Sequence, residues 1–458
     1  MPALTRRQLL LQAAYLAPII ALTTPGHALT APPARPPLAP ALPARTAFDA
    51  YGMNTHFSFL RSVWASTDAA AQWVLSLGVG AVRQSLPRTA HGRDAVKRGM
   101  DQLGLAGIRW CCPVLVIDDA ATLDAARTAV NSQLDWLQAN TDLSLLDALP
   151  GLNEPNAAGR AGRDWVKRTR SAAQALWEET RRRPAFDGVL IQGPPLHMKG
   201  GPAALRPDVS ALGDLSRWMD RGDAHLYPSD NDPEWQIAER LNALQPLHPG
   251  KPVCVSEGGY TTAIGRGYTG GAELVPEEVA NLYAPKHLMV HVLGGRQFFA
   301  YELLDDAAPY RDTDVATREA GFGLVATPTL DPVTWRRKAG FEAMRRLLGL
   351  IRDAGTTPVG LRVSVSAGGG TLRTVLLHRS DGKHLLVLWQ SIDLYEWNRT
   401  TRTGQYLRVT PLPVTVNLDA PLPVAVYEPS TRDTAMSSFV AQTFTHTVGA
   451  ALQVLRIG

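Results

Sequence analysis

The sequence predicts an α/β protein: a (β/α)8 TIM barrel with a C-terminal antiparallel β-sandwich. Short apolar runs alternate with longer amphipathic stretches over residues 47–353, which is typical of βα units around a parallel sheet. Eight such runs occur in this region, the number that a closed barrel of this kind requires. After residue 353 the chain changes to strand-like runs broken by turn residues, which indicates a small sandwich.

The composition is that of a globular protein with a sizeable core. Of the 458 residues, 45% are hydrophobic and 19% are charged. The 46 basic and 42 acidic residues give a formal net charge of +4, too small an imbalance to favour nucleic acid or an anionic membrane. The three cysteines, Cys111, Cys112 and Cys254, have neither zinc-ligand spacing nor the number that a disulfide framework needs, so we expect them to fill a core.

The N-terminal residues predict an export signal over residues 1–28. Arg6 and Arg7 precede an apolar run that extends to about Leu22, and small residues near Ala28 offer a cleavage site. The arginine pair is typical of a twin-arginine signal. An uncleaved membrane anchor is the alternative, but the run is shorter than the roughly 20 residues that a span needs. We therefore expect a mature chain without a membrane span, in the periplasm or outside the cell.

Residues 29–46 predict an extended linker, because they are rich in proline and alanine and have no apolar periodicity. The barrel is then expected over residues 47–353 and the sandwich over residues 354–458.

The predicted barrel strands are residues 51–57, 80–86, 107–116, 145–153, 188–193, 223–227, 252–259 and 296–304. Amphipathic segments between them predict helices, including residues 164–183 and 276–293. The alternative is a doubly wound open sheet. Its glycine-rich phosphate-binding motif is missing here. A motif that begins at Gly78 would need its third glycine at position 83, which is Arg83.

An amphipathic stretch at residues 341–353 ends the predicted barrel. The predicted strands of the sandwich are residues 361–366, 371–378, 383–390, 406–418, 422–429 and 452–457.

Polar side chains follow the predicted barrel strands. Because the carboxyl ends of barrel strands meet at one face, these side chains are the candidates for a site. They are Asn54, His56, Arg83, Asp118, Asp119, Asn153, Glu154, Gln192, His225, Tyr227, Glu257, Tyr301, Glu302, Asp305 and Asp306. Among them we expect His56, Tyr301 and Glu302 to bind or support a substrate.

Glu154 and Glu257 stand out in this set. Glu154 ends the fourth predicted strand and Glu257 the seventh, 103 positions later, and the barrel would bring both carboxylates to one face. Cleavage of a glycosidic bond needs such a pair: one carboxylic acid protonates the departing oxygen, and the other carboxylate attacks the anomeric carbon or activates a water molecule. A separation of about 5 to 5.5 Å indicates retention of configuration, and roughly 6.5 to 9.5 Å indicates inversion.

The motifs around both glutamates resemble those of clan A glycoside hydrolases, the retaining (β/α)8 group that includes cellulases, xylosidases and many β-glycosidases. Asn153-Glu154-Pro155 is similar to the clan's motif at strand four. This resemblance implies Glu154 as the general acid/base and Asn153 as a partner of the sugar 2-hydroxyl. The stretch Ser256-Glu257 with its following glycines is similar to the strand-seven motif, which implies Glu257 as the nucleophile.

Three further residues fit the resemblance. Arg83 is similar to the clan's strand-two arginine, which holds the nucleophile ionised. His225 and Tyr227 resemble the strand-six His-x-Tyr motif, which implies that the phenol reaches the nucleophile and that the imidazole lies beside the acid/base. The clan usually has a tryptophan at strand eight, whereas this strand reads FFAY, so Tyr301 is the candidate for the floor of the sugar site.

Acidic residues near the last strand carry a weaker hypothesis. Asp305 and Asp306, with Asp312 and Asp314 nearby, could bind sugar hydroxyls or calcium, but a solvated acidic loop is the favoured interpretation.

Four tryptophans and a histidine pair are weaker candidates for substrate or metal binding. The candidates for stacking on sugar rings are Trp64, Trp110, Trp165 and Trp235, at least two of which we expect in the core. His287 and His291 have the spacing of a metal pair on a helix, but they lack the glutamate base of that motif. The motifs of zinc proteases, P-loop nucleotide binding and serine hydrolases are missing, and no metal or cofactor is expected.

The sequence therefore predicts an exported, retaining glycoside hydrolase that cleaves a β-type bond in an oligo- or polysaccharide. Glu257 would be the nucleophile and Glu154 the acid/base. Two alternatives share the barrel: a carbohydrate-binding protein on an inactive barrel, and a transglycosylase that remodels glycans. No oligomeric state is predicted.

Overall fold

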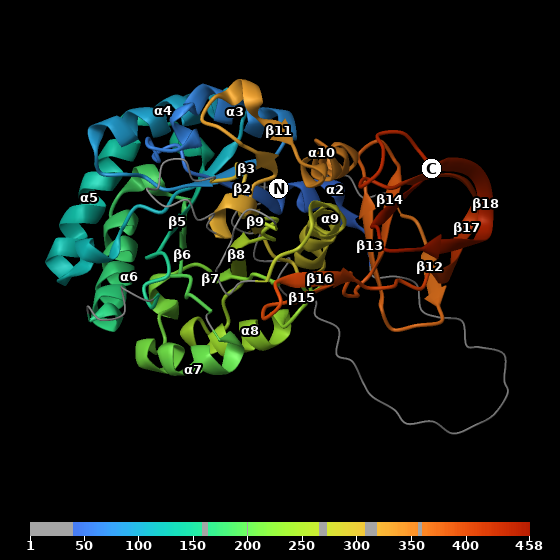
Figure 1. The fold of residues 1–458 in the computed structure, drawn as a ribbon. Helices are drawn as coiled ribbons and strands as arrows, with labels where there is room; N and C mark the ends of the chain where they lie inside the picture. Colours follow the sequence, from blue (N-terminus) through green and yellow to red (C-terminus); the bar gives the residue numbers. More distant parts are fainter. Residues whose placement is uncertain (1–39, 158–163, 199, 265–272, 307–317, 356–359) are drawn as a thin grey trace.

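The computed structural model describes residues 40–157, 164–198, 200–264, 273–306, 318–355 and 360–458. The predicted export signal and residues 29–39 of the predicted linker lie outside these ranges. Figure 1 shows a barrel of strands and helices with a C-terminal sheet region beside it. This is the predicted TIM barrel with a C-terminal β-sandwich. No helix in the described ranges is long and apolar enough to cross a membrane.

The barrel is an eight-stranded parallel sheet in the order β6-β5-β4-β3-β2-β9-β8-β7. A parallel bridge between Gln192 and Arg221 joins β6 to β7 and closes the ring. Each strand overlaps one of the predicted runs. The strands are β2 (Tyr51–Thr55), β3 (Ala81–Gln84), β4 (Arg109–Cys111), β5 (Leu146–Pro150), β6 (Leu190–Gln192), β7 (Gly222–His225), β8 (Val253–Gly258) and β9 (Phe298–Ala300).

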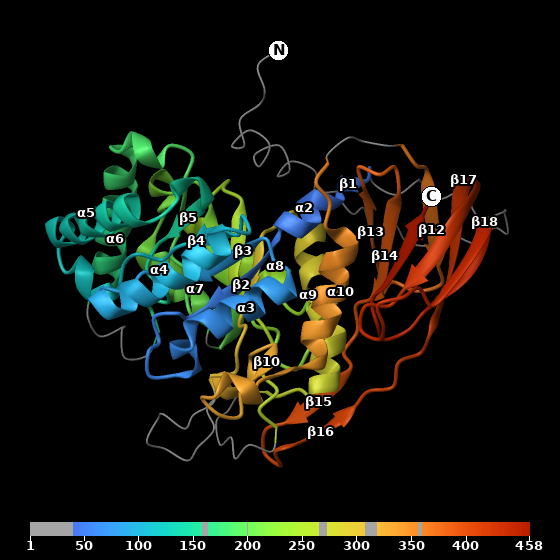
Figure 2. The same cartoon turned by 90° about the horizontal axis from the view of Figure 1, so that it is seen from above.

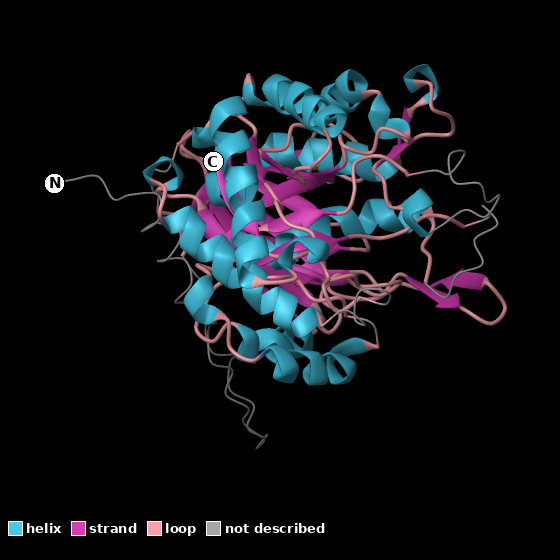
Figure 3. Cartoon of the chain, turned by 90° about the vertical axis from the view of Figure 1, so that its left-hand side faces the viewer, coloured by secondary structure: helices cyan, strands magenta, loops and turns pink. Residues whose placement is uncertain are grey.

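Helices enclose the strands, which lie in the middle of the barrel (Figure 3). The principal helices are α3 (Thr67–Leu77), α4 (Ala90–Gly104), α5 (Leu123–Asn140), α6 (Trp165–Arg181), α7 (Gly201–Leu212), α8 (Ile237–Leu244), α9 (Glu277–Leu293) and α10 (Ala339–Ile351). Side-chain caps fix two of their starts: the hydroxyls of Thr89 and Thr122 accept from backbone amides in the first turns of α4 and α5. Helix α3 ends at Gly78, whose φ of 81° favours glycine.

The interior of the barrel is filled mainly by small side chains and one large ring. Cys111, Cys254 and two alanines pack there around Phe299, and the three cysteines of the chain are buried and unpaired, as expected. Gly52 makes room for the ring, because a Cβ at this position would lie 2.3 Å from Cδ1 of Phe299. The filled interior leaves the carboxyl ends of the strands as the place where polar side chains can meet a substrate.

Ordered packing begins earlier than the predicted linker allows. Strand β1 (Leu42–Pro43) pairs with β13 of the sandwich, and helix α2 (Ala44–Asp49) follows at once. Ala44 and Ala47 are fully buried in the main core. A six-residue helix is too short to show the periodicity that predicts a helix from sequence.

The C-terminal region is an antiparallel sheet around a second apolar core. Its strands are β12 (Val363–Ala367), β13 (Leu372–His378), β14 (His384–Gln390), β17 (Leu412–Tyr427), β18 (Ser437–Val448) and β19 (Gln453–Ile457). A separate hairpin, β15 (Tyr395–Asn398) and β16 (Thr403–Tyr406), leaves this region between β14 and β17.

One long strand joins the two layers of the sandwich. The sequence pattern predicts two strands over residues 406–429, but most of this stretch is the single strand β17. Its first half pairs with β12 and its second half with β19, with a register shift between Asn417 and Leu422 along β18. Figure 1 shows β17 and β18 strongly curved, so that the sheet folds over its own core.

Helices α9 and α10 lie between the barrel and the sandwich (Figure 2). Lys286 of α9 is fully buried and donates from Nζ to the backbone oxygen of Gln390 on β14, at 3.0 Å. On α10, Arg346 donates to the backbone oxygen of Pro429 at 3.1 Å. The two regions are therefore joined by buried polar contacts as well as by apolar packing.

Candidate active site

Glu154 lies just beyond the end of β5. Its backbone φ is 44°, in the left-handed region that non-glycine residues rarely occupy. The amide of Glu154 donates to the backbone oxygen of Pro195 at 3.1 Å, which holds this turn against the segment after β6. Gly151 allows the close approach, because a Cβ there would lie 2.9 Å from the backbone nitrogen of Pro194. Contacts with the segment after β6 therefore hold Glu154 in this rare backbone conformation.

Glu257 lies on β8, and two donors hold its carboxylate. Nη1 of Arg83 donates to Oε1 at 2.7 Å, and the phenol of Tyr227 donates to Oε2 at 2.8 Å. Both oxygens therefore accept a hydrogen bond from the protein, one of them charge-assisted. This arrangement holds the Glu257 carboxylate in a fixed orientation.

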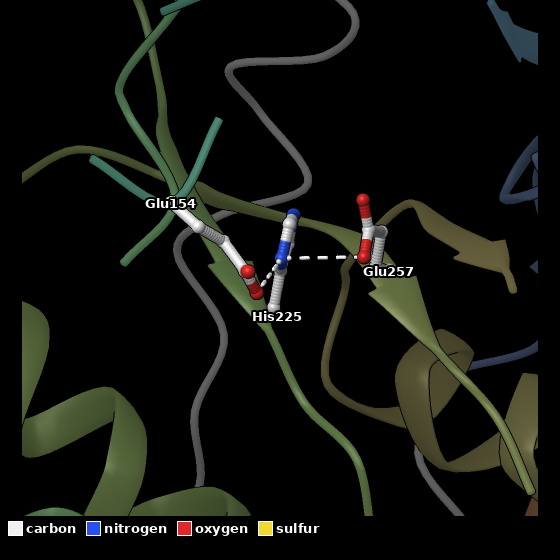
Figure 4. Close-up of side chains that lie close together, drawn as sticks. All are labelled: Glu154, His225 and Glu257. Carbon is white, nitrogen blue, oxygen red and sulfur yellow. Dashed lines mark hydrogen bonds and ion pairs between the residues drawn. The ribbon is translucent and has the colours of Figure 1, made fainter. Parts of the chain in front are cut away.

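His225, at the end of β7, lies between the two glutamates (Figure 4). Its Nδ1 is 2.9 Å from Oε1 of Glu154 and 3.4 Å from Oε2 of Glu257. One oxygen from each carboxylate and Nδ1 of His225 all lie within 4.8 Å of one another. The barrel thus brings together two carboxylates that are 103 residues apart in the chain.

Arg83 connects the nucleophile candidate to the neighbouring strands. Besides Glu257, it donates to Oδ1 of Asn153 at 2.7 Å and to Oδ1 of Asn54 at 3.0 Å. Asn54 in turn donates to the backbone oxygen of Ser256 at 3.0 Å. Because its oxygen already faces Arg83, the amide group of Asn153 is oriented with its nitrogen on the other side.

The environment raises the pKa values of His225, Tyr227 and Arg83. Burial alone would lower the pKa of His225, but the Glu257 and Glu154 carboxylates outweigh it and the pKa is raised. Burial, together with the nearby Glu257 charge, raises the pKa of Tyr227 well above its ordinary value, so the phenol remains a donor. Burial opposes the charge of Arg83, yet Glu257 and Asp223 raise its pKa. Arg83 is therefore a permanent cation in this network.

His56 and Glu302 form a second pair beside the first network. Nε2 of His56 lies 3.1 Å from Oε2 of Glu302, whose side chain is fully buried. Burial lowers the pKa of His56 to about 4, so the ring is neutral near pH 7. The ring of Tyr301 links this pair to the first network, because its centroid lies 5.6 Å from that of His56 and 6.2 Å from that of Tyr227. All nine predicted site residues therefore lie in one connected region at the carboxyl ends of the strands.

Two residues of this region were missed by sequence reasoning. Phe322 follows β9 by more than twenty positions, yet its ring lies 5.4 Å from Tyr227 and 5.5 Å from Tyr301. Asp223, fully buried on β7, accepts from the hydroxyl of Ser256 at 2.9 Å and so holds β8 next to Glu257. A charged residue inside an apolar strand was the available signal for Asp223. No local signal marks Phe322, because it lies well beyond the end of the nearest predicted strand, residues 296–304.

Asp305 and Asp306, which follow β9, are buried and do not lie in the solvated loop that the sequence favours. Asp305 is fully buried, and Nζ of Lys338 donates to its Oδ1 at 2.6 Å. Lys338 also donates to Oγ1 of Thr262 at 2.9 Å, so the pair ties the segments after β8 and β9 together. The physical reason is pairing: a buried carboxylate is tolerated when a buried cation lies against it. Asp312 and Asp314 lie outside the described residues.

Two of the candidate stacking tryptophans belong to the core. Trp64 is fully buried, and Trp110 is 3% exposed with its indole nitrogen donating to the backbone oxygen of Gln84. Trp235 is half-buried and carries the guanidinium of Arg240 at 4.4 Å from its ring, and Trp165 is also half-buried.

The histidine pair on α9 packs against the back of the barrel. The rings of His287 and His291 lie 4.3 and 4.7 Å from the ring of Phe298, and both side chains are buried. Over the residues that the structure describes, neither belongs to a group of three potential metal ligands. Both rings contribute to the apolar packing around Phe298.

The cluster at the barrel end suits proton transfer and attack at carbon. Its two carboxylates and one imidazole are also the ligand types that a metal ion takes. A cation there would lie close to the guanidinium of Arg83, which already pairs with Glu257 at 2.7 Å, and like charges repel at such distances.

No protein-family model and no curated protein sequence matches the chain. Among solved structures, a monomeric β-xylosidase from Caulobacter crescentus CB15 is similar, with a TM-score of 0.55, 14% identity and coverage of 92% of this chain and 97% of that chain. A family 51 α-L-arabinofuranosidase from Bifidobacterium longum gives a TM-score of 0.53 at 11% identity, covering 91% and 96%. The GH39 enzyme from Xanthomonas axonopodis pv. citri gives 0.51 at 13%, covering 92% and 95%. The chain shares their fold. Similarity over nearly the full length of both chains includes the barrel and the C-terminal region.

Proposed function

We propose that the protein is a retaining glycoside hydrolase that cleaves a β-type glycosidic bond, with Glu257 as nucleophile and Glu154 as general acid/base. The observation that carries this proposal is the pair of carboxylates at the strand ends, with one oxygen of each within 4.8 Å of the other. Retaining glycosidases place their carboxyl groups about 5 to 5.5 Å apart, and inverting enzymes roughly 6.5 to 9.5 Å apart. The glycoside hydrolases among the similar folds support the same reaction class.

The first step forms a covalent glycosyl-enzyme. An oxygen of Glu257 bonds to the anomeric carbon as the bond from that carbon to the leaving oxygen breaks. Arg83 and Tyr227 orient the attacking carboxylate. The proton of Glu154 passes to the leaving oxygen, which departs as an alcohol.

The second step releases the sugar. Glu154, now ionised, takes a proton from a water molecule as its oxygen bonds to the anomeric carbon, and the bond to Glu257 breaks. His225 contacts Glu154 in both steps: a protonated Glu154 can donate to Nδ1, and an ionised Glu154 can accept from a protonated Nδ1. The raised pKa of His225 favours the second of these contacts and so supports the ionised base.

Asn153 and Tyr301 complete the proposed sugar site. The oxygen of Asn153 accepts from Arg83, and the amide nitrogen is the donor of this side chain that the proposal directs to a sugar hydroxyl. Tyr301, which contacts Tyr227 edge-on, is our candidate for the role that a strand-eight tryptophan has in clan A enzymes. An aromatic face at this position suits the apolar face of a pyranose ring.

The deciding experiment is a panel of aryl β-glycosides tested with the wild type, Glu257→Ala and Glu239→Ala. Glu239 is an exposed glutamate on α8 and serves as the matched control. We expect turnover of at least one glycoside by the wild type and the control, and a loss on the order of 10⁴-fold or more in Glu257→Ala. Proton NMR of the first product formed should show the substrate's β configuration.

Chemical rescue identifies the nucleophile. Glu257→Gly with azide should produce a glycosyl azide of α configuration, because azide then attacks directly in place of the carboxylate. Initial hydrolysis with an inverted product would overturn the retaining mechanism. Binding of oligosaccharides without any turnover would instead identify a carbohydrate-binding protein, and preferential transfer to an added sugar acceptor would identify a transglycosylase.

A further inference from the structure

An aromatic side chain stands exposed on the loop after β2, at the same end of the barrel as the two glutamates. Phe59 is 45% exposed, and the adjacent Leu60 is 39% exposed. Large apolar side chains are usually buried, and two in succession form a small apolar surface. The loop backbone is well fixed: the amide of Phe59 donates to His56 at 2.8 Å, and its carbonyl accepts from the hydroxyl of Ser62 at 2.8 Å.

The ring of Phe59 is held flat against a neighbour. It stacks on His56 with centroids 4.6 Å apart and an angle of 12° between the planes. On its other sides, His56 lies 3.1 Å from Oε2 of Glu302 and packs against the ring of Trp64, with centroids 5.5 Å apart. The lowered pKa of His56 keeps its ring neutral near pH 7, so the contact is a stack of two neutral rings. One face of the phenyl ring is therefore covered, and the exposed part of the side chain is a rigid flat surface.

A series of ring contacts joins Phe59 to the nucleophile. His56, which carries Phe59, lies 5.6 Å from Tyr301. Tyr301 lies 6.2 Å from Tyr227, whose phenol donates to Glu257. Aromatic surface thus continues from the reacting carboxylate outward to an exposed ring. In a saccharide chain bound at the carboxylates, only the units on one side of the cleaved bond would contact this aromatic surface.

The order of strands shows which side that is. In the closed ring, β2 is separated from β5 by β3 and β4, whereas only β9 separates it from β8. Phe59 follows β2, and Glu154 follows β5, so the exposed ring lies on the Glu257 side, far around the ring from the proton donor. The leaving group departs beside the proton donor. Phe59 therefore lies toward the part of the substrate that stays on the enzyme.

We propose that Phe59 is a stacking platform for a second sugar unit on the non-leaving side of the cleaved bond. The inference rests on the proposed function and adds the substrate class: oligosaccharides that place at least two sugar units on that side. A flat aromatic ring against the apolar face of a pyranose is worth about tenfold in affinity, by analogy with aromatic pairs in proteins.

The test compares an aryl β-monoglycoside with the aryl β-diglycoside of the same sugar, using the sugar that the wild type turns over fastest. We expect kcat/KM of the wild type to be about tenfold higher for the diglycoside. Phe59→Ala should bring the ratio of the two kcat/KM values close to one, mainly through KM for the diglycoside. Phe59→Tyr keeps a flat ring and should keep the ratio.

Controls separate this inference from the proposed function and from misfolding. Leu105→Ala removes a more exposed apolar side chain, 93% exposed at the end of α4 and before β4, and should keep the wild-type ratio. A wild type that gains nothing from the second sugar, or a Phe59→Ala variant with an unchanged ratio, would overturn the inference alone. Failure of the wild type to turn over any aryl glycoside would overturn the proposed function. Thermal unfolding of Phe59→Ala close to the wild-type temperature would show that any change in ratio arises at the binding surface.

Discussion

Nη1 of Arg83 lies 2.7 Å from Oε1 of Glu257, so a guanidinium on β3 is paired with a carboxylate at the end of β8, 174 positions later in the chain. Both groups are buried. The same guanidinium donates to Asn153, the residue before Glu154. One side chain therefore holds Glu257 directly and orients the neighbour of Glu154.

Replacing Arg83 should damage activity and stability together. Arg83→Met leaves the buried Glu257 carboxylate without its cation, which typically costs about 3 to 5 kcal/mol of unfolding free energy. We expect kcat to fall on the order of 10²-fold or more, because the attacking carboxylate is no longer oriented. Arg109→Met is the control, since Arg109 on β4 pairs with Asp49 and Asp147 and touches none of the site residues. Wild-type kcat in Arg83→Met, measured alongside urea unfolding, would contradict the positioning role.

The acid role of Glu154 depends on the leaving group. In Glu154→Ala we expect a loss of about 10² to 10⁴-fold for glycosides with poor leaving groups, because these need a proton in the transition state. Dinitrophenyl glycosides should lose much less in the first step. Rates measured across a series of leaving-group pKa values give the comparison, and equal losses on all substrates would count against proton donation by Glu154.

Acid should destabilise the protein through buried histidines. Burial lowers the pKa of His287 to about 3, whereas an unfolded histidine titrates near 6.5. As the pH falls below 6.5, the unfolded chain binds a proton at His287, whereas the folded chain does not bind it until about pH 3. The unfolding free energy therefore decreases between about pH 6.5 and pH 3. At pH 4.5 the loss from this one residue is about 3 kcal/mol.

His287→Leu should remove that part of the pH dependence. Urea unfolding at pH 7 and pH 4.5 measures the difference in unfolding free energy, which should be smaller in the variant by about 2 to 3 kcal/mol. His91→Leu changes an exposed histidine and should leave the difference unchanged. If His287→Leu retained the full wild-type difference, the buried neutral histidine would not be its source.

A buried carboxylate connects the barrel to the sandwich. Asp232, after β7, accepts from the hydroxyl of Ser391 at 2.8 Å and from the amide of Ile392 at 3.2 Å. We expect Asp232→Ala to lower the unfolding free energy by about 2 to 4 kcal/mol, because buried donors lose their acceptor. Thermal unfolding measures this, with the exposed Asp381→Ala as control. An unchanged unfolding temperature would mean that this contact does not stabilise the junction.

The barrel could be predicted because each of its strands is a local apolar run with its own turn residues. The sandwich was harder. Strand β18 (Ser437–Val448) alternates apolar residues with threonine, serine and glutamine over an exposed surface, and no strand was predicted there. Strand β17 was predicted as two strands, since the proline and aspartate near its bend interrupt the apolar pattern although the backbone continues.

The sequence by itself determined the order of the barrel strands and the two glutamates that follow the fourth and seventh of them. Those features are local: an apolar run, a break, and an acidic residue at the break. The tertiary structure decided which side chains surround them. It placed His225 between the carboxylates, buried Asp305 against Lys338, and left Phe59 exposed on its stack with His56. Distances between residues on different strands depend on barrel closure and register, and no short stretch of sequence contains that information. The export signal predicted around Arg6 and Arg7 stays a prediction.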